Sequence, residues 1–392
     1  MYSRGIILIS GFLTLLTFAT FIVEFLRRRP KSVDSATLAS CRSRINAWWL
    51  LFSSLICALL LGTGFTVLFF GVVSFWALRE YVTITPTRLA DHKMLVGVFF
   101  VLTPLQFFLV GVDSDWFQRV VGYDSYFFYS AMIPSLAFLL LPAIVALSDD
   151  VKFYLERIAK LQVGLLICVY SLSFVPAILT MNLSKGGDGS AADVSGIVAA
   201  NLESKVIEPI EQMISSPDLA VQANSTSVLI EGEEREPVES EIGSHEKSPG
   251  QSPYPMRTPA NVTLLFVFVV LTQVSDVAQF LWSLAFPRHK VAAKVNSNRT
   301  YEGLTLGVLT TVIVAIALVR FLPFDSWQKA GMAGAIVACM GFAGNMTLSA
   351  IKRDRGVSEF DSLIEGHNGV LDRIDSLCFA APVFFHFIRM CC

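Results

Sequence analysis

The residues best suited to chemistry lie near the end of the chain, in a short polar stretch between two strongly apolar segments. This stretch, residues 349–375, holds the carboxylates of Asp372 and Asp375 and the cations of Lys352 and Arg353. Two Asp residues three positions apart lie on one face of a helix and can share a cation. Charges at a membrane boundary are costly unless they are solvated or used. The pattern is therefore typical of a metal-dependent site that handles the phosphate of a lipid.

An isolated acid, Asp276, lies inside the apolar segment 261–284. A carboxylate in such a segment must be paired, solvated or bound to an ion, which makes Asp276 a candidate for the same site. The alternative is that its side chain forms a structural hydrogen bond between helices.

A second polar stretch, residues 296–303, leads into another apolar segment. Its residues that could bind a ligand are Asn296, Ser297, Arg299 and Thr300. A helix start of this composition offers backbone N–H groups and a guanidinium, and both suit phosphate oxygens. The simpler alternative is an ordinary helix N-cap at Asn298 or Thr300, with Glu302 nearby.

The composition places these stretches in a membrane protein. The chain has 392 residues, of which 54% are hydrophobic and 16% charged, and its mean hydropathy is +0.59. Soluble domains are charged at about a quarter of their positions. The net charge of −2 gives no general electrostatic attraction to nucleic acid, so nucleic acid is not an expected partner.

The apolar runs predict an all-α polytopic membrane protein with about ten transmembrane helices. The predicted helices cover residues 5–26, 47–62, 64–79, 93–111, 127–147, 161–180, 261–284, 304–322, 330–350 and 375–390. With the N-terminus outside, every basic cluster between these spans falls on the cytoplasmic side, as the positive-inside rule requires. The polar stretches 296–303 and 349–375 then also face the cytoplasm, and the absence of a sorting signal favours a bacterial inner membrane.

One long segment differs from the rest of the chain. Residues 183–259 carry 13 acidic residues against five Lys or Arg, a net charge of −8. They lack the apolar content to form a core and are predicted to be a disordered extracytoplasmic loop. The loop is either a tolerated insertion or a regulatory segment that binds a partner. The chain thus divides into a first helix with a basic linker (1–46), N-terminal helices (47–182), the acidic loop (183–259) and a C-terminal helical region (260–392).

The polar stretches carry a family resemblance. Ser349-x-x-Lys352-Arg353 and His367-Asn368-Gly369-x-x-Asp372-Arg373-x-Asp375 resemble the signature of the phosphatidate cytidylyltransferase (CDP-diacylglycerol synthase) family, which runs S-x-x-K-R and then H-G-G-x-x-D-R-x-D. Asp276 matches an Asp of that family. Arg299-Thr300-Tyr301-Glu302-Gly303 resembles its K-T-W-E-G, and Ala77-Leu78-Arg79-Glu80 also looks familial. The resemblance covers about residues 47–180 and 260–392.

The resemblance implies the transfer of a cytidylyl group from CTP to phosphatidic acid, with Mg²⁺ as cofactor, in a lipid bilayer and as a homodimer. Asp276, Asp372 and Asp375 would hold the metal, and Mg²⁺ usually takes only one or two carboxylates directly. Lys352, Arg353, Arg373 and Arg299 would contact phosphates of CTP or of the lipid. Asn296, Ser297 and Thr300 would bind the nucleotide. His367 would either contact phosphate or support the turn that contains it.

The sequence also departs from the family pattern. The Lys of the family's K-T-W-E-G is Arg299 here, and the family's Ser-Pro before that motif is Asn296-Ser297. The acidic position of the family's G-D-L segment is Asn345. The family's K-D pair is Ser358-Glu359 here, and one of the two Gly of the family's H-G-G is Asn368. Lys and Arg are not equivalent where a phosphate is bound. These changes leave open full activity, an inactive scaffold or lipid binder, and an enzyme acting on another lipid phosphate such as that of a polyprenol. Transport is disfavoured because the charges gather at one membrane face.

Overall fold

The computed structural model describes residues 35–85, 92–147, 152–181, 259–357 and 369–391, together with parts of 10–24. The described helices belong to a single unit made of Met1–Leu183 and Ser252–Cys392. The predicted turn that contains His367 and nearly all of the predicted disordered loop 183–259 lie outside these ranges, so both stay predictions.

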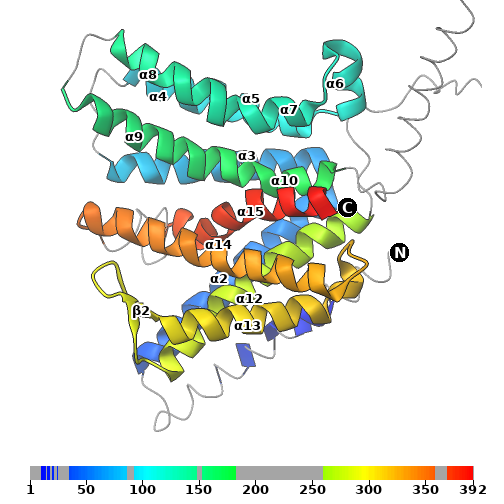
Figure 1. Ribbon diagram of the computed structural model, residues 1–392, viewed down its shortest axis with the longest axis vertical. Coiled ribbons are helices and arrows are strands. Elements are labelled where there is room, and N and C mark those ends of the chain that lie inside the picture. The colour runs from blue at the N-terminus through cyan, green and yellow to red at the C-terminus, as the bar shows by residue number, and fades with distance from the viewer. Residues whose placement is uncertain are drawn as a thin grey trace, which may run out of the picture. The chain divides into compact units, whose positions relative to one another are not determined.

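The N-terminal half consists mainly of apolar helices (Figure 1). Helix α2 covers Ser35–Leu61 and α3 covers Thr63–Ile84. Helices α4 (His92–Gly97) and α5 (Thr103–Gly111) form one continuous rod, as do α7 (Ser125–Ala131) with α8 (Phe138–Ala146) and α9 (Tyr154–Gly164) with α10 (Leu172–Thr180). A short helix, α6 (Ser114–Val121), connects the first of these rods to the second.

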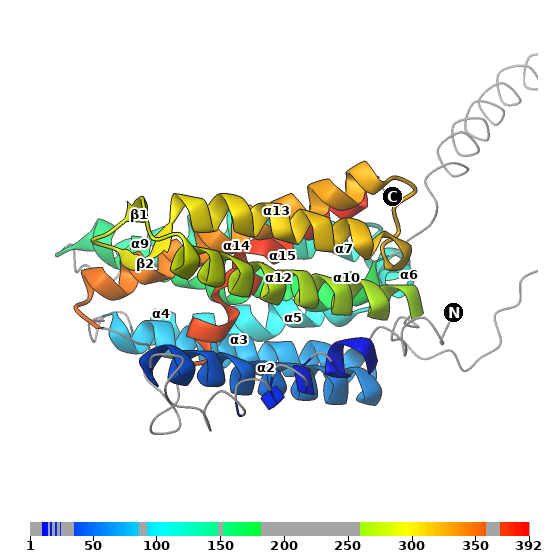
Figure 2. The ribbon, with the colours of Figure 1, turned by 90° about the horizontal axis from the view of Figure 1, so that it is seen from below.

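The C-terminal half contains four longer helices and a β-hairpin. Helix α12 (Pro259–Ala285) leads into β1 (Lys290–Ala292) and β2 (Asn296–Thr300), followed by α13 (Tyr301–Ala317), α14 (Trp327–Asp354) and α15 (Leu371–Cys391). Helix α13 packs on α12 and α14, and α14 packs on α15. Figures 1 and 2 both show the hairpin at one end of these helices. Helix α15 lies against α3 and α10 of the N-terminal half.

These helices confirm an all-α polytopic membrane protein. Seven described segments are long and apolar enough to cross a bilayer, and they are Thr63–Ile84, Met94–Gly111, Ser125–Ala146, Tyr154–Thr180, Ala260–Ala285, Trp327–Asp354 and Leu371–Cys391. Two shorter apolar helices cover Trp48–Leu61 and Tyr301–Ala317. Every predicted span from 47–62 onward thus coincides with a described helix. The first predicted span, 5–26, is described only in part, and those residues are helical, so the total of ten stays a prediction.

Each continuous rod of the N-terminal half contains a π-helical turn near a proline. The π-helical segments are Val98–Leu102, Met132–Ala137 and Leu165–Ser171. Proline lacks the N–H that an α-helix needs, and wider turns let neighbouring groups satisfy the carbonyls it leaves. In the first of these turns the Val98 carbonyl accepts both the Thr103 N–H and, at 2.9 Å, the Thr103 hydroxyl.

Glycines allow the C-terminal helices to approach closely. A Cβ at Gly307 of α13 would overlap the Gln279 side chain of α12. A Cβ at Gly344 of α14 would lie 2.6 Å from the Asp375 carbonyl oxygen of α15. In a bilayer the burial of apolar surface contributes little to the association of helices. Contacts between small residues such as these allow the close packing that holds the helices together. The close approach brings the polar residues of α12, α14 and α15 within hydrogen-bond distance of one another.

Candidate functional site

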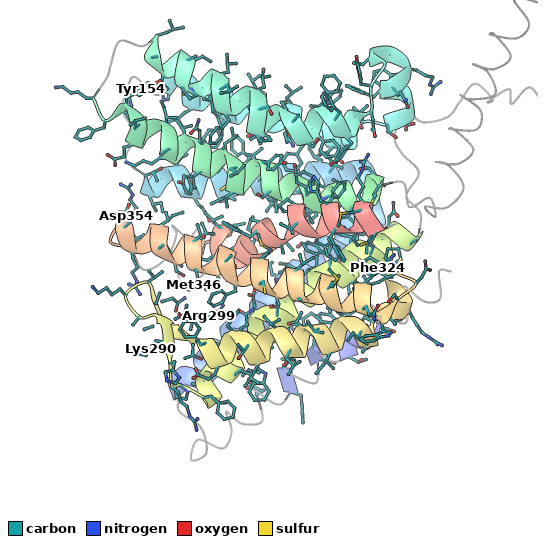
Figure 3. The ribbon with its side chains drawn as sticks, viewed as in Figure 1. Tyr154, Lys290, Arg299, Phe324, Met346 and Asp354 are labelled. Carbon is teal, nitrogen blue, oxygen red and sulfur yellow. The ribbon has the colours of Figure 1, made fainter. Side chains whose placement is uncertain are left out.

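The predicted polar residues gather at one end of the C-terminal helices. The end of α12, the hairpin, the end of α14 and the start of α15 meet there. Figure 3 labels Lys290, Arg299 and Asp354 at this end and Phe324 at the other. The two polar stretches, far apart in sequence, therefore form one site.

The stretch 296–303 consists of strand β2 followed by the start of α13. Strand β2 pairs antiparallel with β1, with Lys290 opposite Thr300 and Ala292 opposite Asn296. Thr300 caps α13, because its hydroxyl accepts the Gly303 N–H at 3.0 Å. The N-cap predicted at Asn298 or Thr300 is thus confirmed at Thr300. The hairpin pairing holds the polar side chains over the helix ends.

Two carboxylates converge on one hydroxyl at the centre of the site. Ser376 Oγ lies 2.7 Å from Asp276 Oδ1 and 3.3 Å from Asp375 Oδ1. Asp375 is 7% exposed, and its Oδ1 also accepts the Ser376 backbone N–H at 2.7 Å. A hydroxyl has one proton and can donate to only one of the two acids at a time. The pair therefore concentrates negative charge where α12 meets α15.

An amide chain connects this acid pair to the hairpin. Asn345 of α14 donates from Nδ2 to Asp375 Oδ2 at 2.8 Å. Asn296 of β2 donates from Nδ2 to Asn345 Oδ1 at 3.4 Å and to Ser349 Oγ at 3.3 Å. The family's acidic position is thus occupied by a donor that supports Asp375, which a carboxylate could not do. The departure at Asn345 has a defined structural role.

Lys352 and Asp372 form an ion pair beside the acid pair. Lys352 Nζ lies 2.6 Å from Asp372 Oδ1, and the two side chains are 18% and 9% exposed. Lys352 and Arg353 both belong to the last turn of α14, whereas the sequence predicts that they follow the helix. Arg353 is exposed and donates from Nε to the Val295 carbonyl at 3.4 Å. The cations thus lie where the two polar stretches meet.

Arg299 is buried under the hairpin rather than exposed on it. It is 5% exposed, and its Nη1 donates to Gln279 Oε1 at 3.2 Å. Gln279 in turn donates to Ser275 Oγ at 3.0 Å and to the Ala338 carbonyl at 3.1 Å. Gln279 thus links the Arg299 guanidinium to α12 and, through the Ala338 carbonyl, to α14.

The remaining predicted residues lie at the edge of the site or beyond the described residues. Thr300 is buried, and Ser297 is exposed on β2, with its Oγ 3.5 Å from Asn298 Oδ1. Arg373 is half-buried in the first turn of α15. His367 lies outside the described residues. Glu302 accepts from the ring nitrogen of His289 at 2.6 Å and so fastens β1 to α13.

Several contributing residues are absent from the sequence-based set of site residues. Ser376, Gln279 and Asn345 contact the predicted residues directly. Ser376 directly follows Asp375, and Gln279 lies three residues after Asp276 on the same helix face, so spacing alone could have indicated both. Asn345 could be noticed only as a departure from the family pattern.

The donor set fits a hard divalent cation held by two carboxylates. Among the residues that the structure describes, no group of three or more His, Cys, Asp or Glu side chains is arranged to hold a metal. Asp276 and Asp375 come together at Ser376, while Asp372 pairs with Lys352. Mg²⁺ prefers oxygen ligands, keeps several waters and needs only one or two carboxylates. Of the three predicted metal ligands, Asp276 and Asp375 thus form a pair, and Asp372 lies beside them in an ion pair.

Comparison with known proteins places the chain among nucleotide-handling membrane enzymes. A sequence model described as "Cytidylyltransferase family" matches residues 42–391. An uncharacterized protein of Escherichia coli (strain K12), YnbB, is 28% identical over 383 residues, which are 96% of each chain.

Phosphatidate cytidylyltransferases match over a shorter region. The enzyme of Haemophilus influenzae is 34% identical over 129 residues, 32% of this chain and 44% of that protein. The enzyme of Synechocystis sp. is 26% identical over 136 residues, 34% of this chain and 46% of that protein. The chain thus matches less than half the length of these two enzymes.

Proposed function

The chain belongs to the cytidylyltransferase family, and from that premise we propose that it transfers a cytidylyl group from CTP to phosphatidic acid. The products are CDP-diacylglycerol and pyrophosphate, for use in phospholipid synthesis. The observation that carries the proposal is the convergence of Asp276 and Asp375 on the Ser376 hydroxyl, at one end of apolar helices and beside Lys352 and Arg353. Such a site can receive a water-soluble nucleotide and a lipid phosphate together.

The proposed reaction is a displacement at phosphorus. An oxygen of the lipid phosphate attacks the α-phosphorus of CTP, and the bond from that phosphorus to the oxygen bridging to the β-phosphate breaks. Pyrophosphate leaves with that oxygen. A phosphate monoester has a second pKa of about 6, so the attacking oxygen is already ionised near neutral pH and needs no general base. The site therefore needs no Ser-His-Asp arrangement.

The main obstacle is repulsion between two anions. Lys352 is placed to meet a phosphate because it lies in the last turn of α14 with its side chain partly exposed. Arg353, Arg373 and Arg299 surround the same region and can offset the charge of nucleotide and lipid phosphates. Asn296, Ser297 and Thr300 would orient the nucleotide through the hairpin.

Asp276 and Asp375 are the proposed ligands of Mg²⁺. When bound, Mg²⁺ neutralises phosphate charge and stabilises the leaving pyrophosphate. Ser376 and Asn345 would hold the two carboxylates in place through the hydrogen bonds described above. The protein is proposed to lie in a bacterial inner membrane with the site facing the cytoplasm. The basic clusters of the chain lie on the same side of the membrane as the site, and the positive-inside rule makes that side cytoplasmic.

Asn345→Asp tests whether the acid pair binds a cation. The new carboxylate would face Asp375 Oδ2, which now accepts from the Asn345 amide at 2.8 Å. Losing that donor costs about 1–3 kcal/mol in the metal-free protein, so we expect its unfolding temperature to fall. Added Mg²⁺ should then raise the unfolding temperature of the variant more than that of the wild type. Equal Mg²⁺ effects in thermal scans of the two proteins would count against a cation at Asp375.

The lipid specificity is tested with the purified protein in mixed micelles. Pyrophosphate release from CTP and Mg²⁺ is compared with phosphatidic acid, with polyprenyl phosphate and without lipid. We expect release only with phosphatidic acid. Release only with polyprenyl phosphate would change the substrate but keep the chemistry. A folded protein that binds CTP but releases no pyrophosphate with either lipid would contradict both proposed lipid substrates. A folded protein that binds no CTP would favour a scaffold or lipid-binding role.

A further inference from the structure

A buried carboxylate of the N-terminal half holds the first residues of α15. Glu80 of α3 is 2% exposed. Its Oε1 accepts the Val370 N–H at 2.9 Å and its Oε2 accepts the Leu371 N–H at 2.8 Å. Both oxygens thus bind the backbone at the start of the helix that carries Asp372 and Asp375.

This contact replaces the cap that the local sequence lacks. The first N–H groups of a helix have no partner within the helix and are usually bound by a Ser, Thr, Asp or Asn just before it. The residue at that position here is Val370, whose side chain cannot accept a hydrogen bond. A carboxylate at a helix N-terminus also interacts favourably with the helix dipole. Burying the charge of Glu80 is costly unless it is hydrogen-bonded, and the two amides supply those bonds.

The capped turn contains the site residues. Asp372 is the second residue of α15, and Asp375 lies one turn further on. If the first turn frayed, Asp372 would leave Lys352, and the backbone that fixes Asp375 against Asn345 would loosen. Another contact between the N-terminal helices and this region is an exposed ion pair. It joins Glu156 of α9 to Arg355 at 3.8 Å, with Glu156 52% exposed.

We propose that Glu80 is a positioning residue, which fixes the start of α15 so that Asp375 can hold a divalent cation together with Asp276. The inference rests on the proposed function, because it takes the acid pair as the metal site. Glu80 itself touches neither substrate nor metal. It makes the N-terminal helices a necessary part of a site whose other described side chains come from the C-terminal half.

Glu80→Gln in the full-length protein, purified in detergent, tests the inference. A Gln side chain can accept one of the two N–H bonds but turns an NH₂ group toward the other. Binding of Mn²⁺, as a probe for Mg²⁺, is measured by electron paramagnetic resonance without substrates. We expect its dissociation constant to rise about 10–100-fold, as for the loss of groups that support metal ligands. The Mg²⁺ concentration for half-maximal activity should rise in parallel, while the KM for CTP at saturating Mg²⁺ changes little.

Glu156→Gln is the matched control. It also removes a carboxylate of an N-terminal helix, and that carboxylate contacts Arg355 in the polar stretch 349–375. Its exposed ion pair contributes little, so Mn²⁺ binding should stay within about twofold of wild type. A folded Glu80→Gln protein with wild-type Mn²⁺ binding overturns the inference. If Glu80→Gln does not fold, Glu80→Asp replaces it. That variant keeps the charge but is one methylene shorter, and unchanged Mn²⁺ binding by it overturns the inference equally.

The same experiment separates this inference from the proposed function. Wild-type protein that binds Mn²⁺ but transfers no cytidylyl group contradicts the proposed function, and the Glu80→Gln effect on Mn²⁺ binding still decides the inference. Wild-type protein that binds no Mn²⁺ overturns the inference together with the metal site.

Discussion

Asp375→Asn is expected to lower the rate of cytidylyl transfer by about 10³-fold or more, since a metal contributes several kcal/mol to such a transition state and each 1.36 kcal/mol is a factor of ten. The same change should alter the stability of the metal-free protein much less. Asp375 shares the Ser376 hydroxyl with Asp276, so removing its charge relieves a repulsion between two nearby carboxylates. That relief offsets the loss of one hydrogen bond that Asp375 accepts from Asn345 or from the Ser376 N–H. A large loss of activity with little loss of stability is the signature of a ligand-binding acid.

The measurement combines steady-state rates with thermal unfolding in detergent, with and without Mg²⁺. Mg²⁺ should raise the unfolding temperature of the wild type but not that of Asp375→Asn. Asp325→Asn is the control, because Asp325 is an exposed acid that precedes α14 at its other end. Mg²⁺-dependent transfer within tenfold of the wild-type rate in Asp375→Asn would show that Asp375 is not a required ligand.

Lys352→Met has the second largest expected effect. We expect kcat/KM for CTP to fall about 10²–10³-fold, the usual cost of removing one donor that stabilises developing charge in a transition state. The methionine also removes the ion pair that Lys352 makes with Asp372, whose side chain is only 9% exposed. That loss should destabilise the protein by about 1–3 kcal/mol. Both the activity and the stability are therefore expected to fall.

A second substitution separates these two effects. In Lys352→Met combined with Asp372→Asn, both charges of this ion pair are removed together, so we expect the unfolding temperature to recover while activity stays low. Lys329→Met is the control, because Lys329 is also a half-buried lysine of α14 but binds the Cys391 carbonyl at the helix's other end. Recovery of activity in the double variant would mean that Lys352 only balances Asp372 and does not contact a phosphate.

The helices could be predicted because apolar runs of this length have few alternatives in a bilayer. Their ends could not be predicted as well. Helix α14 continues to Asp354 and α15 begins at Leu371, whereas the predicted spans end at 350 and begin at 375. Hydropathy marks where a helix leaves the hydrocarbon rather than where its hydrogen bonds stop, so Lys352 and Asp372 are helical although they are charged.

The types of the site residues could be predicted, but their contacts could not. Asp276, Asp375 and Lys352 follow from charge beside apolar segments, because such charge needs a use or a partner. The partners come from helix packing that no local pattern contains. Asn345 contacts Asp375 from another helix, and Glu80 binds Leu371 across 291 positions of sequence.

The irregular backbone also lay beyond sequence patterns. Strand β2 is polar throughout and is held by pairing with β1 and by the helix ends beneath it, so strand propensity gives no signal. The π-helical turns arise where prolines interrupt apolar helices, and the same residues predict an ordinary kink equally well.

The central claim is that the site moves the α-phosphorus of CTP onto a lipid phosphate. It is tested most directly by following a label from CTP in the presence of phosphatidic acid, Mg²⁺ and the purified protein. With ³²P at the α position, the label should enter the organic phase as CDP-diacylglycerol, and with ³²P at the γ position it should appear as pyrophosphate. Label from the γ position in the lipid, or inorganic phosphate as the released product, would contradict cytidylyl transfer and indicate a different phosphoryl chemistry at this site.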